Sequence, residues 1–196
     1  MPDSSQDAER LLREAGAMLE GHFQLSSGRH SGLYVEKFRL LERPPQTDAL
    51  CGMIADWAKP LSPEVCAGPT TGGLLLSYEV ARHLGLRSIF AEKAEGAETG
   101  GLPASGRVFE RGFTIAPGER VLVVDDVLTT GGSIRDVLEA VRGLGGEPIG
   151  VGVVIDRGGG KVDFGLPLFA CLKLDLPTYE ADACPLCEQG IPLTIT

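Results

Sequence analysis

The segment with the clearest chemical content is VLVVDDVLTTGGS, residues 121–133. Four aliphatic residues, Val121–Val124, predict a buried strand that carries the carboxylates of Asp125 and Asp126 to its end. Burying two carboxylates without partners is costly, so we expect a polyhydroxyl or cationic ligand there. The threonines, glycines and Ser133 that follow predict a turn into a helix, where backbone amides and hydroxyls favour an anion. Together these residues predict a cradle for a sugar phosphate.

A purely structural interpretation of this segment is the alternative. In it, the two acids leave the sheet and Ser133 caps the following helix. The length and order of the run of acids, threonines and glycines favour ligand binding instead. The segment is neither a Walker A loop, because GxxxxGK[ST] is absent, nor a dinucleotide-binding GxGxxG motif.

The elements around this segment alternate along the chain. From residue 64 onward, short apolar runs alternate with helical patterns, which predicts an α/β fold with a central, mostly parallel sheet flanked by helices. Loops at the carboxyl ends of such strands carry the site. We expect strands over 65–67, 88–91, 121–124 and 149–155, and helices over 72–84 and 134–144. Nearer the N-terminus we expect helices over 7–19 and 46–57, the second preceded by Pro44 and Pro45, and two short strands within 23–37.

Composition limits the class of protein. The chain has 196 residues, 43% of them hydrophobic, which is enough for one folded domain. Its 27 acidic and 18 basic residues give a formal charge of −9, which argues against nucleic acid as a partner. No apolar run approaches the ~20 residues of a membrane span, and the acidic N-terminus is unlike a secretory signal. Five cysteines, an odd number, do not suit a secreted disulfide framework, so we expect a cytoplasmic protein with no membrane partner.

The 121–133 segment resembles the thirteen-residue signature of the type I phosphoribosyltransferases, which use 5-phosphoribosyl diphosphate (PRPP). The resemblance implies that Asp125 and Asp126 hold the ribose hydroxyls near Mg²⁺, with the ion carried mainly by PRPP oxygens and no direct protein ligand assigned. The turn would bind the 5-phosphate, and AGPTTGG (67–73) is similar to the diphosphate loop. Lys93 opens a glycine-rich loop, where contact with the diphosphate is favoured over a plain surface role. The implied PRPP-binding residues are Thr70, Thr71, Gly72, Lys93, Asp125, Asp126, Val127, Leu128, Thr129, Thr130, Gly131, Gly132 and Ser133, and the implied catalytic residues are Asp125, Asp126 and Lys93.

A second stretch, GHFQLSSGRHSGLYVEKFRL (21–40), is similar to the N-terminal hood of the orotate phosphoribosyltransferases, on the pattern FxLxSGxxS followed by an aromatic residue. IDRGGG (155–160) adds an arginine where that family binds orotate. The implied orotate-binding residues are Ser26, Tyr34, Val35, Thr129 and Arg157. The implied reaction joins orotate to the ribose 5-phosphate of PRPP, giving orotidine 5'-monophosphate and diphosphate in de novo pyrimidine (UMP) synthesis. A homodimer is implied as well.

The resemblance covers nearly the whole chain and implies the type I phosphoribosyltransferase fold in one domain, residues 1–196. We expect a hood of about 1–40 with the C-terminal segment, a core of about 46–175, and a flexible catalytic loop at 92–107 that closes over the site. Two other functions share the diphosphate motif. They are a purine or xanthine phosphoribosyltransferase and a non-catalytic regulator that senses PRPP, although the charge of −9 argues against the regulator.

The chain departs from the family pattern at several basic positions. The family often has a basic residue at the position of Ser26 and an aromatic-Lys pair at the positions of Thr71 and Gly72. Family members often have Arg-Lys where this chain has Glu92-Lys93, and this chain has no Lys or His in 94–106. His30, in the hood, does not replace a loop histidine. Candidate substitutes are Lys37, Arg107 and Arg111, for which a solvated surface position is an equal alternative.

Two cysteines near the C-terminus form a CPLC motif, Cys184 to Cys187, with the spacing of metal ligands or a disulfide. Zinc normally takes four ligands, so we prefer a reduced pair in a terminal turn. A site shared across a dimer, or one completed by other cysteines, is the alternative. His22 and His83 are expected to be structural.

Overall fold

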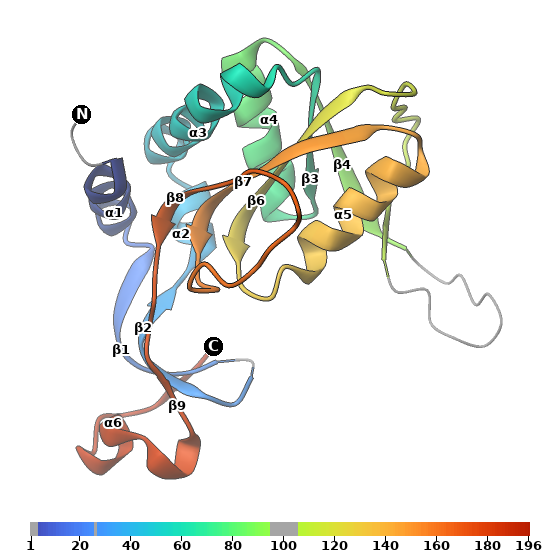
Figure 1. Ribbon diagram of the computed structural model, residues 1–196. Coiled ribbons are helices and arrows are strands. Elements are labelled where there is room, and N and C mark those ends of the chain that lie inside the picture. The colour runs from blue at the N-terminus through green and yellow to red at the C-terminus, as the bar shows by residue number, and fades with distance from the viewer. Residues whose placement is uncertain (1–3, 26, 95–105) are drawn as a thin grey trace, which may run out of the picture.

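The computed structural model describes residues 4–25, 27–94 and 106–196 (Figure 1). Its main sheet has the strand order β5-β4-β3-β6-β7-β8, with β5 antiparallel and the other strands parallel. The strands are β3 (Val65–Pro69), β4 (Arg87–Lys93), β5 (Arg107–Val108), β6 (Arg120–Leu128), β7 (Glu147–Asp156) and β8 (Leu168–Lys173). Ser26 and residues 95–105 of the predicted catalytic loop lie outside the described residues.

Helices cover both faces of this sheet (Figure 1). They are α1 (Ser4–Glu14), α2 (Lys37–Leu41), α3 (Pro44–Ala58), the short η1 (Lys59–Leu61), α4 (Gly72–Leu84) and α5 (Gly132–Gly143). Strand β6 explains the arrangement, because Leu122 and Val124 pack in one core with α1, α3 and α4, whereas Val121 and Val123 pack in the other core with α5. Because both faces of this strand are buried, residues 121–124 are all apolar, as the sequence indicated.

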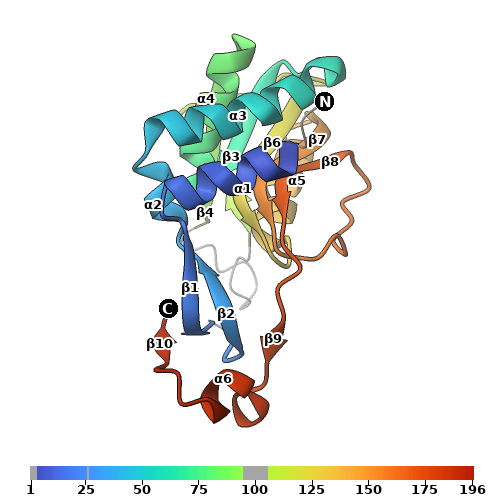
Figure 2. The ribbon, with the colours of Figure 1, turned by 90° about the vertical axis from the view of Figure 1, so that its left-hand side faces the viewer.

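A second, smaller sheet joins the two ends of the chain in the order β10-β1-β2-β9. Strands β1 (Met18–Gln24) and β2 (His30–Val35) form an antiparallel hairpin that pairs with β9 (Thr178–Tyr179) on one side and β10 (Thr194–Ile195) on the other. Between the last two strands lie η2 (Ala181–Ala183) and α6 (Pro185–Glu188). We call this sheet with η2 and α6 the hood. It extends from the main sheet in Figures 1 and 2, whereas α1, which the predicted hood included, packs against α3 and β8.

Several predicted boundaries were wrong. The helix expected over 7–19 ends at Glu14, because Gly16 adopts a positive φ of 68° that breaks the helix, and Met18 already begins β1. Strand β6 continues through Leu128, so Asp125 lies inside the sheet opposite Val153. The structural alternative in which both acids leave the sheet is therefore contradicted.

The ends of the predicted catalytic loop are also strands. Glu92 pairs with Val108 and Lys93 with Arg107, so β4 and β5 form a short ladder at the positions where the loop was expected to begin and end. No helix among the described residues is long and apolar enough to cross a membrane.

Candidate active site

A cavity of about 460 Å³ opens at the carboxyl ends of β3, β4 and β6, and we call it the strand-end cavity. Strands β3 and β6 are neighbours, but the chain continues outward from them in opposite directions, and such a switch point is where open α/β sheets bind ligands. All the residues predicted to bind PRPP line this cavity, together with Lys37, Pro69, Arg107 and Ile134. Leu128 contributes through its backbone, because its side chain is buried in the α5 core.

A second cavity, of about 730 Å³, lies between the hood and the main sheet, and we call it the hood cavity. Its walls include Tyr34, Val35, Thr129 and Arg157, which are the described members of the predicted orotate-binding set. The two cavities share five residues, which are Lys37, Asp126, Val127, Thr129 and Thr130. They are therefore continuous, and Asp126 lies at their junction.

Two helices begin at the strand-end cavity with free amides. Helix α5 starts after Gly131, whose φ is 80°, and α4 starts after Thr71. Within the described part of the chain, no side chain caps either helix. Ser133 lies inside the first turn of α5, so the structural alternative in which it caps this helix is contradicted. Uncapped amides at a helix N-terminus attract an anion, and this cavity has two such termini.

The two acids of β6 are buried side by side. The Asp126 amide donates to Asp125 Oδ1 at 2.8 Å, and Asp126 Oδ1 accepts from the Val127 amide at 2.7 Å. Asp126 Oδ2 forms an ion pair with Lys37 Nζ at 2.9 Å but accepts no well-directed hydrogen bond within the described residues. This oxygen is available to a hydroxyl donor of a ligand.

Burial raises the pKa of Asp125 to about 7, and the adjacent charge of Asp126 adds to this effect. Hydrogen bonding from the Asp126 amide and the charges of Lys37 and Arg107 oppose the rise. The carboxylate pair therefore retains a proton near neutral pH for part of the time, and a ligand that supplies hydroxyl donors or positive charge would favour the fully ionised pair.

The loop between β3 and α4 packs directly on this pair. A Cβ atom at Gly72 would lie 1.7 Å from Asp126 Oδ2, so no side chain fits there. Thr71 and Gly72, which stand where the resemblance expected an aromatic-Lys pair, bring no cation to the carboxylates. The cation beside the carboxylates comes instead from Lys37 at the start of α2. The peptide bond between Thr70 and Thr71 is cis.

Of the three candidate substitute cations, the structure brings two into the site. Lys37 pairs with Asp126, and the buried Arg107 guanidinium donates to Thr70 Oγ1 and the Ala91 carbonyl, each at 3.1 Å. Arg111 instead pairs with Glu92 at 2.7 Å on the surface. Spacing along the chain does not distinguish these residues, because Lys37 reaches Asp126 from an element about ninety positions away.

Arg157 lies half-buried in the wall of the hood cavity, and burial lowers its pKa. The salt bridges considered for it, to Asp156 or Asp163, do not form among the described residues. Asp156 accepts from the amides of Gly158 and Gly160, and Asp163 accepts from the Gly165 amide. The guanidinium can therefore bind an anionic or carbonyl-bearing ligand.

Comparison with known proteins agrees with this geometry. The family model "Phosphoribosyl transferase domain" matches residues 49–171, which include both the β3–α4 loop and the β6–α5 segment. The orotate phosphoribosyltransferase of Thermotoga maritima is 47% identical over 184 residues, covering 94% of each chain. The crystal structure of orotate phosphoribosyltransferase from Aeropyrum pernix superimposes with a TM-score of 0.70 at 29% identity, covering 84% of this chain and 92% of that one. The crystal structure of the orotate phosphoribosyltransferase from Mycobacterium tuberculosis superimposes with a TM-score of 0.70 at 27% identity, covering 88% of this chain and 97% of that one.

The fold and the strand-end cavity thus have the architecture of a phosphoribosyltransferase domain. At this identity and coverage, the chain belongs to the orotate phosphoribosyltransferase family.

Proposed function

We propose that the protein transfers the ribose 5-phosphate group of PRPP to orotate, giving orotidine 5'-monophosphate and diphosphate in pyrimidine synthesis. The observation that carries this proposal is the junction of the two cavities. A cavity with two uncapped helix termini meets a cavity with an aromatic side chain and a guanidinium, and a carboxylate lies where they join. This is the arrangement needed to join a phosphorylated sugar to a planar base.

In this proposal, the two anionic ends of PRPP bind at the two helix termini. The amides of the Thr129–Ser133 turn bind the 5-phosphate, and the loop Thr70–Gly72 binds the diphosphate, with Lys93 at the same cavity wall. The two sites are separated because α4 and α5 follow neighbouring strands but pack on opposite faces of the sheet. Charge-assisted hydrogen bonds of this kind position the sugar between them.

Asp125 and Asp126 act on the ribose. Asp126 Oδ2, which has spare acceptor capacity, receives a ribose hydroxyl. Transfer at the anomeric carbon develops positive charge on the sugar ring, and nearby carboxylates stabilise that charge without forming a covalent bond. Binding of the sugar hydroxyls also lowers the cost of ionising Asp125, whose pKa is raised in the free protein.

Orotate occupies the hood cavity in this proposal. The Arg157 fork binds its polar edge, while Tyr34, Val35 and Thr129 line its ring site. The base then enters from the hood side, and the diphosphate leaves on the side of the β3–α4 loop. An in-line displacement at the sugar needs these opposite directions.

The site also fits the Mg²⁺ ion implied by the family. Buried carboxylates and threonine hydroxyls are hard oxygen donors, and PRPP would supply most of the ligands near Asp125 and Asp126. When bound, the ion would neutralise charge on the departing diphosphate. The chain's own contribution is to orient the ribose oxygens that hold it.

We further propose a homodimer. An apolar groove of about 490 Å³ runs between α2, α3 and α4, lined by Leu41, Pro44, Leu75 and Tyr78 among others. Tyr78 is 65% exposed and Leu75 46%, which is unusual for large apolar side chains on adjacent turns. Analytical ultracentrifugation should show a dimer for the wild type and a monomer for Tyr78→Glu. None of the five cysteines, all of which the structure describes, forms a disulfide, which supports a cytoplasmic location.

The experiment that tests the function is an ultraviolet assay of orotate consumption with PRPP and Mg²⁺, with EDTA as the control. Parallel assays contain adenine, hypoxanthine or xanthine in place of orotate. We expect turnover of orotate alone. Consumption of a purine without orotate would overturn the proposal in favour of a purine enzyme, and PRPP binding without any turnover would favour a regulator.

A further inference from the structure

The hood contains a cluster of four potential metal ligands that the proposed reaction does not use. His22 lies on β1, His30 on β2, Cys184 immediately before α6, and Cys187 within it. The first three side chains are nearly inaccessible, with exposed fractions of 2%, 4% and 1%. The hood sheet brings the CPLC motif against the N-terminal hairpin, which supplies the two ligands that the motif lacks by itself.

Three nitrogen–sulfur separations in this cluster match a tetrahedral zinc site to within about 0.2 Å. Zinc bonds of about 2.0–2.1 Å to nitrogen and 2.3 Å to sulfur require N–N, N–S and S–S separations of about 3.3, 3.6 and 3.8 Å. His22 Nε2 lies 3.5 Å from Cys184 Sγ and 3.7 Å from Cys187 Sγ, and His30 Nδ1 lies 3.4 Å from Cys187 Sγ. The two nitrogens are 2.9 Å apart, and all four atoms lie within 4.8 Å of one another.

Hydrogen bonding alone cannot satisfy this cluster. His22 Nδ1 lies 2.8 Å from the Ile191 carbonyl, which only accepts, so Nδ1 carries the proton of the neutral ring. Nε2 then has a single lone pair, yet His30 Nδ1, Cys184 Sγ and Cys187 Sγ all converge on it. One lone pair accepts one hydrogen bond, whereas one cation would bind all four donors.

The surrounding structure orients the ligands as metal sites require. A histidine ligand commonly donates its other N–H to a carbonyl, which fixes the ring, and Ile191 serves His22 in this way. The pairing register of β1 with β2 shifts between Glu20 and Phe23, so that His22 and Phe23 are both buried although they are consecutive. Such a bulge turns the His22 side chain toward the cluster, whereas in a regular strand consecutive side chains would point to opposite faces.

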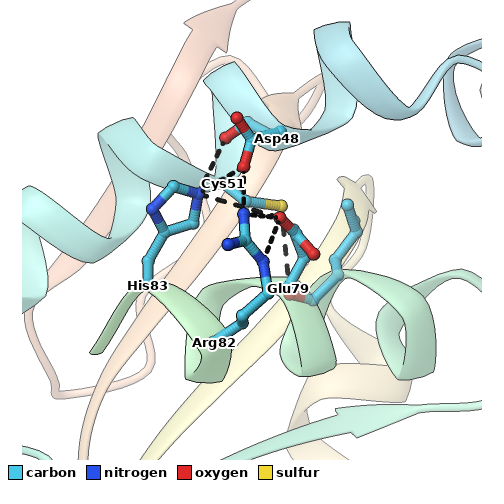
Figure 3. A network of polar contacts seen from close by, with 6 residues as sticks. Asp48, Cys51, Glu79, Arg82 and His83 are labelled. Carbon is cyan, nitrogen blue, oxygen red and sulfur yellow. Dashed lines mark hydrogen bonds and ion pairs between the residues drawn. The ribbon is translucent and has the colours of Figure 1, made fainter. Parts of the chain in front are cut away.

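A second cluster of potential metal ligands differs from this one, because its acidic groups already have a partner. Asp48, Glu79 and His83 also come within ligand distance of one another, on α3 and α4 (Figure 3). There the Arg82 guanidinium already pairs with both carboxylates, lying 2.6 Å from Glu79, and His83 Nε2 is 2.9 Å from Asp48. Both carboxylates of that partly exposed cluster are already paired with a side-chain cation, so it carries no metal proposal.

We propose that His22, His30, Cys184 and Cys187 bind one structural Zn²⁺ ion. Two thiolates and two imidazoles in a closed set of four protein ligands are typical of structural zinc and leave no position for a substrate. Two strands of the hood have only two residues each, and so small a sheet gains little stability from its own packing. The ion would fasten the C-terminal segment to the β1–β2 hairpin.

The zinc site also supports a wall of the hood cavity. Arg29 on the hairpin donates to Thr178 Oγ1 at 2.9 Å and to the Thr178 carbonyl at 2.8 Å, and both residues line that cavity. Loss of the metal should therefore loosen this wall while the strand-end cavity, built from the main sheet, keeps its shape.

The test is the metal content of the full chain, produced without a histidine tag in zinc-supplemented medium and purified without chelator. Mass spectrometry should find one zinc per chain in the wild type. The double variant Cys184→Ser/Cys187→Ser should have lost it. Cys171→Ser, which changes a buried cysteine outside the cluster, is the matched control and should retain it.

Cobalt gives a readout that does not depend on a folded variant. Wild-type protein stripped of zinc and reloaded with Co²⁺ should show the thiolate-to-cobalt charge-transfer and tetrahedral ligand-field bands, which no oxygen-lined PRPP site produces. Hydrogen exchange should show that zinc protects amides in 18–35 and 178–195. Wild-type protein that contains no zinc and gives no thiolate–cobalt spectrum would overturn the proposal, as would a double variant that keeps its zinc.

Discussion

Replacing Asp125 by asparagine should stabilise the fold while it removes activity. Asparagine has the same shape and keeps the oxygen that accepts from the Asp126 amide, but it carries no charge to bury. The pKa of Asp125 rises from 3.8 to about 7 on folding. At about 1.36 kcal/mol per pKa unit, the ionised side chain costs the folded state up to about 4 kcal/mol.

The pH dependence follows from where the proton is held. Between pH 4 and pH 7 the unfolded chain has released the Asp125 proton while the folded chain retains it, so wild-type stability falls as pH rises through this window. Asp125→Asn lacks this slope. Its advantage in free energy of unfolding should be near zero at pH 4 and should reach its full value at pH 8.

Urea denaturation followed by the fluorescence of Trp57, which stacks on Phe169, measures this difference at several pH values. Asp175→Asn, at an exposed aspartate, makes the same change in charge and should leave stability nearly unchanged throughout. Turnover of orotate by Asp125→Asn should fall roughly 100-fold. A variant that is less stable than the wild type at pH 8, or a difference that does not vary with pH, would refute the reasoning.

Three further substitutions test separate parts of the site. Arg157→Ala should raise the KM for orotate by about tenfold or more and leave the KM for PRPP unchanged, because a charge-assisted hydrogen bond contributes roughly 1.5–3 kcal/mol. Equal changes in the two KM values, measured by steady-state kinetics, would refute the placement of Arg157 beside the base. Gly72→Ala puts a Cβ atom 1.7 Å from Asp126 Oδ2, so it should lower the free energy of unfolding in urea by about 1–3 kcal/mol and reduce turnover. Gly143→Ala, with open space around the new methyl group, should change neither quantity. Lys37→Met leaves Asp126 without its ion pair, so it should destabilise the fold by roughly 1–2 kcal/mol, seen as a lower Tm, and should abolish turnover. Arg111→Met, which removes a surface ion pair, should change Tm and turnover little.

The sequence predicted the main sheet well because its elements are local. Helix α4 has the predicted bounds, Gly72–Leu84, and the strands at 65, 88, 121 and 149 each lie within an observed strand. Apolar runs bounded by glycine carry this information within a few residues. The strand-end cavity was predictable for the same reason, since its main segment is contiguous.

Features that depend on distant contacts were not predictable from local pattern. The end of α1 depends on the conformation of Gly16, and the continuation of apolar residues through Met18 suits either a helix or a strand. The pairing of Lys37 with Asp126 depends on where α2 packs against the main sheet, and the meeting of His22 with Cys184 depends on how the two ends of the chain pair within the hood. Spacing along the chain contains no signal for such contacts.

The two cavities differ in how the chain builds them, and this difference has a consequence for the order of folding. The strand-end cavity comes chiefly from one contiguous segment and its neighbouring strand, whereas the hood cavity combines residues near 30, 130, 157 and 178. Closing a loop of about 150 residues between the hairpin and β9 carries an entropic cost that only the assembled main sheet can offset. A refolding chain should therefore gain affinity for PRPP before it gains affinity for orotate, so that one substrate reports the formation of the core and the other reports the arrival of the chain's last strands.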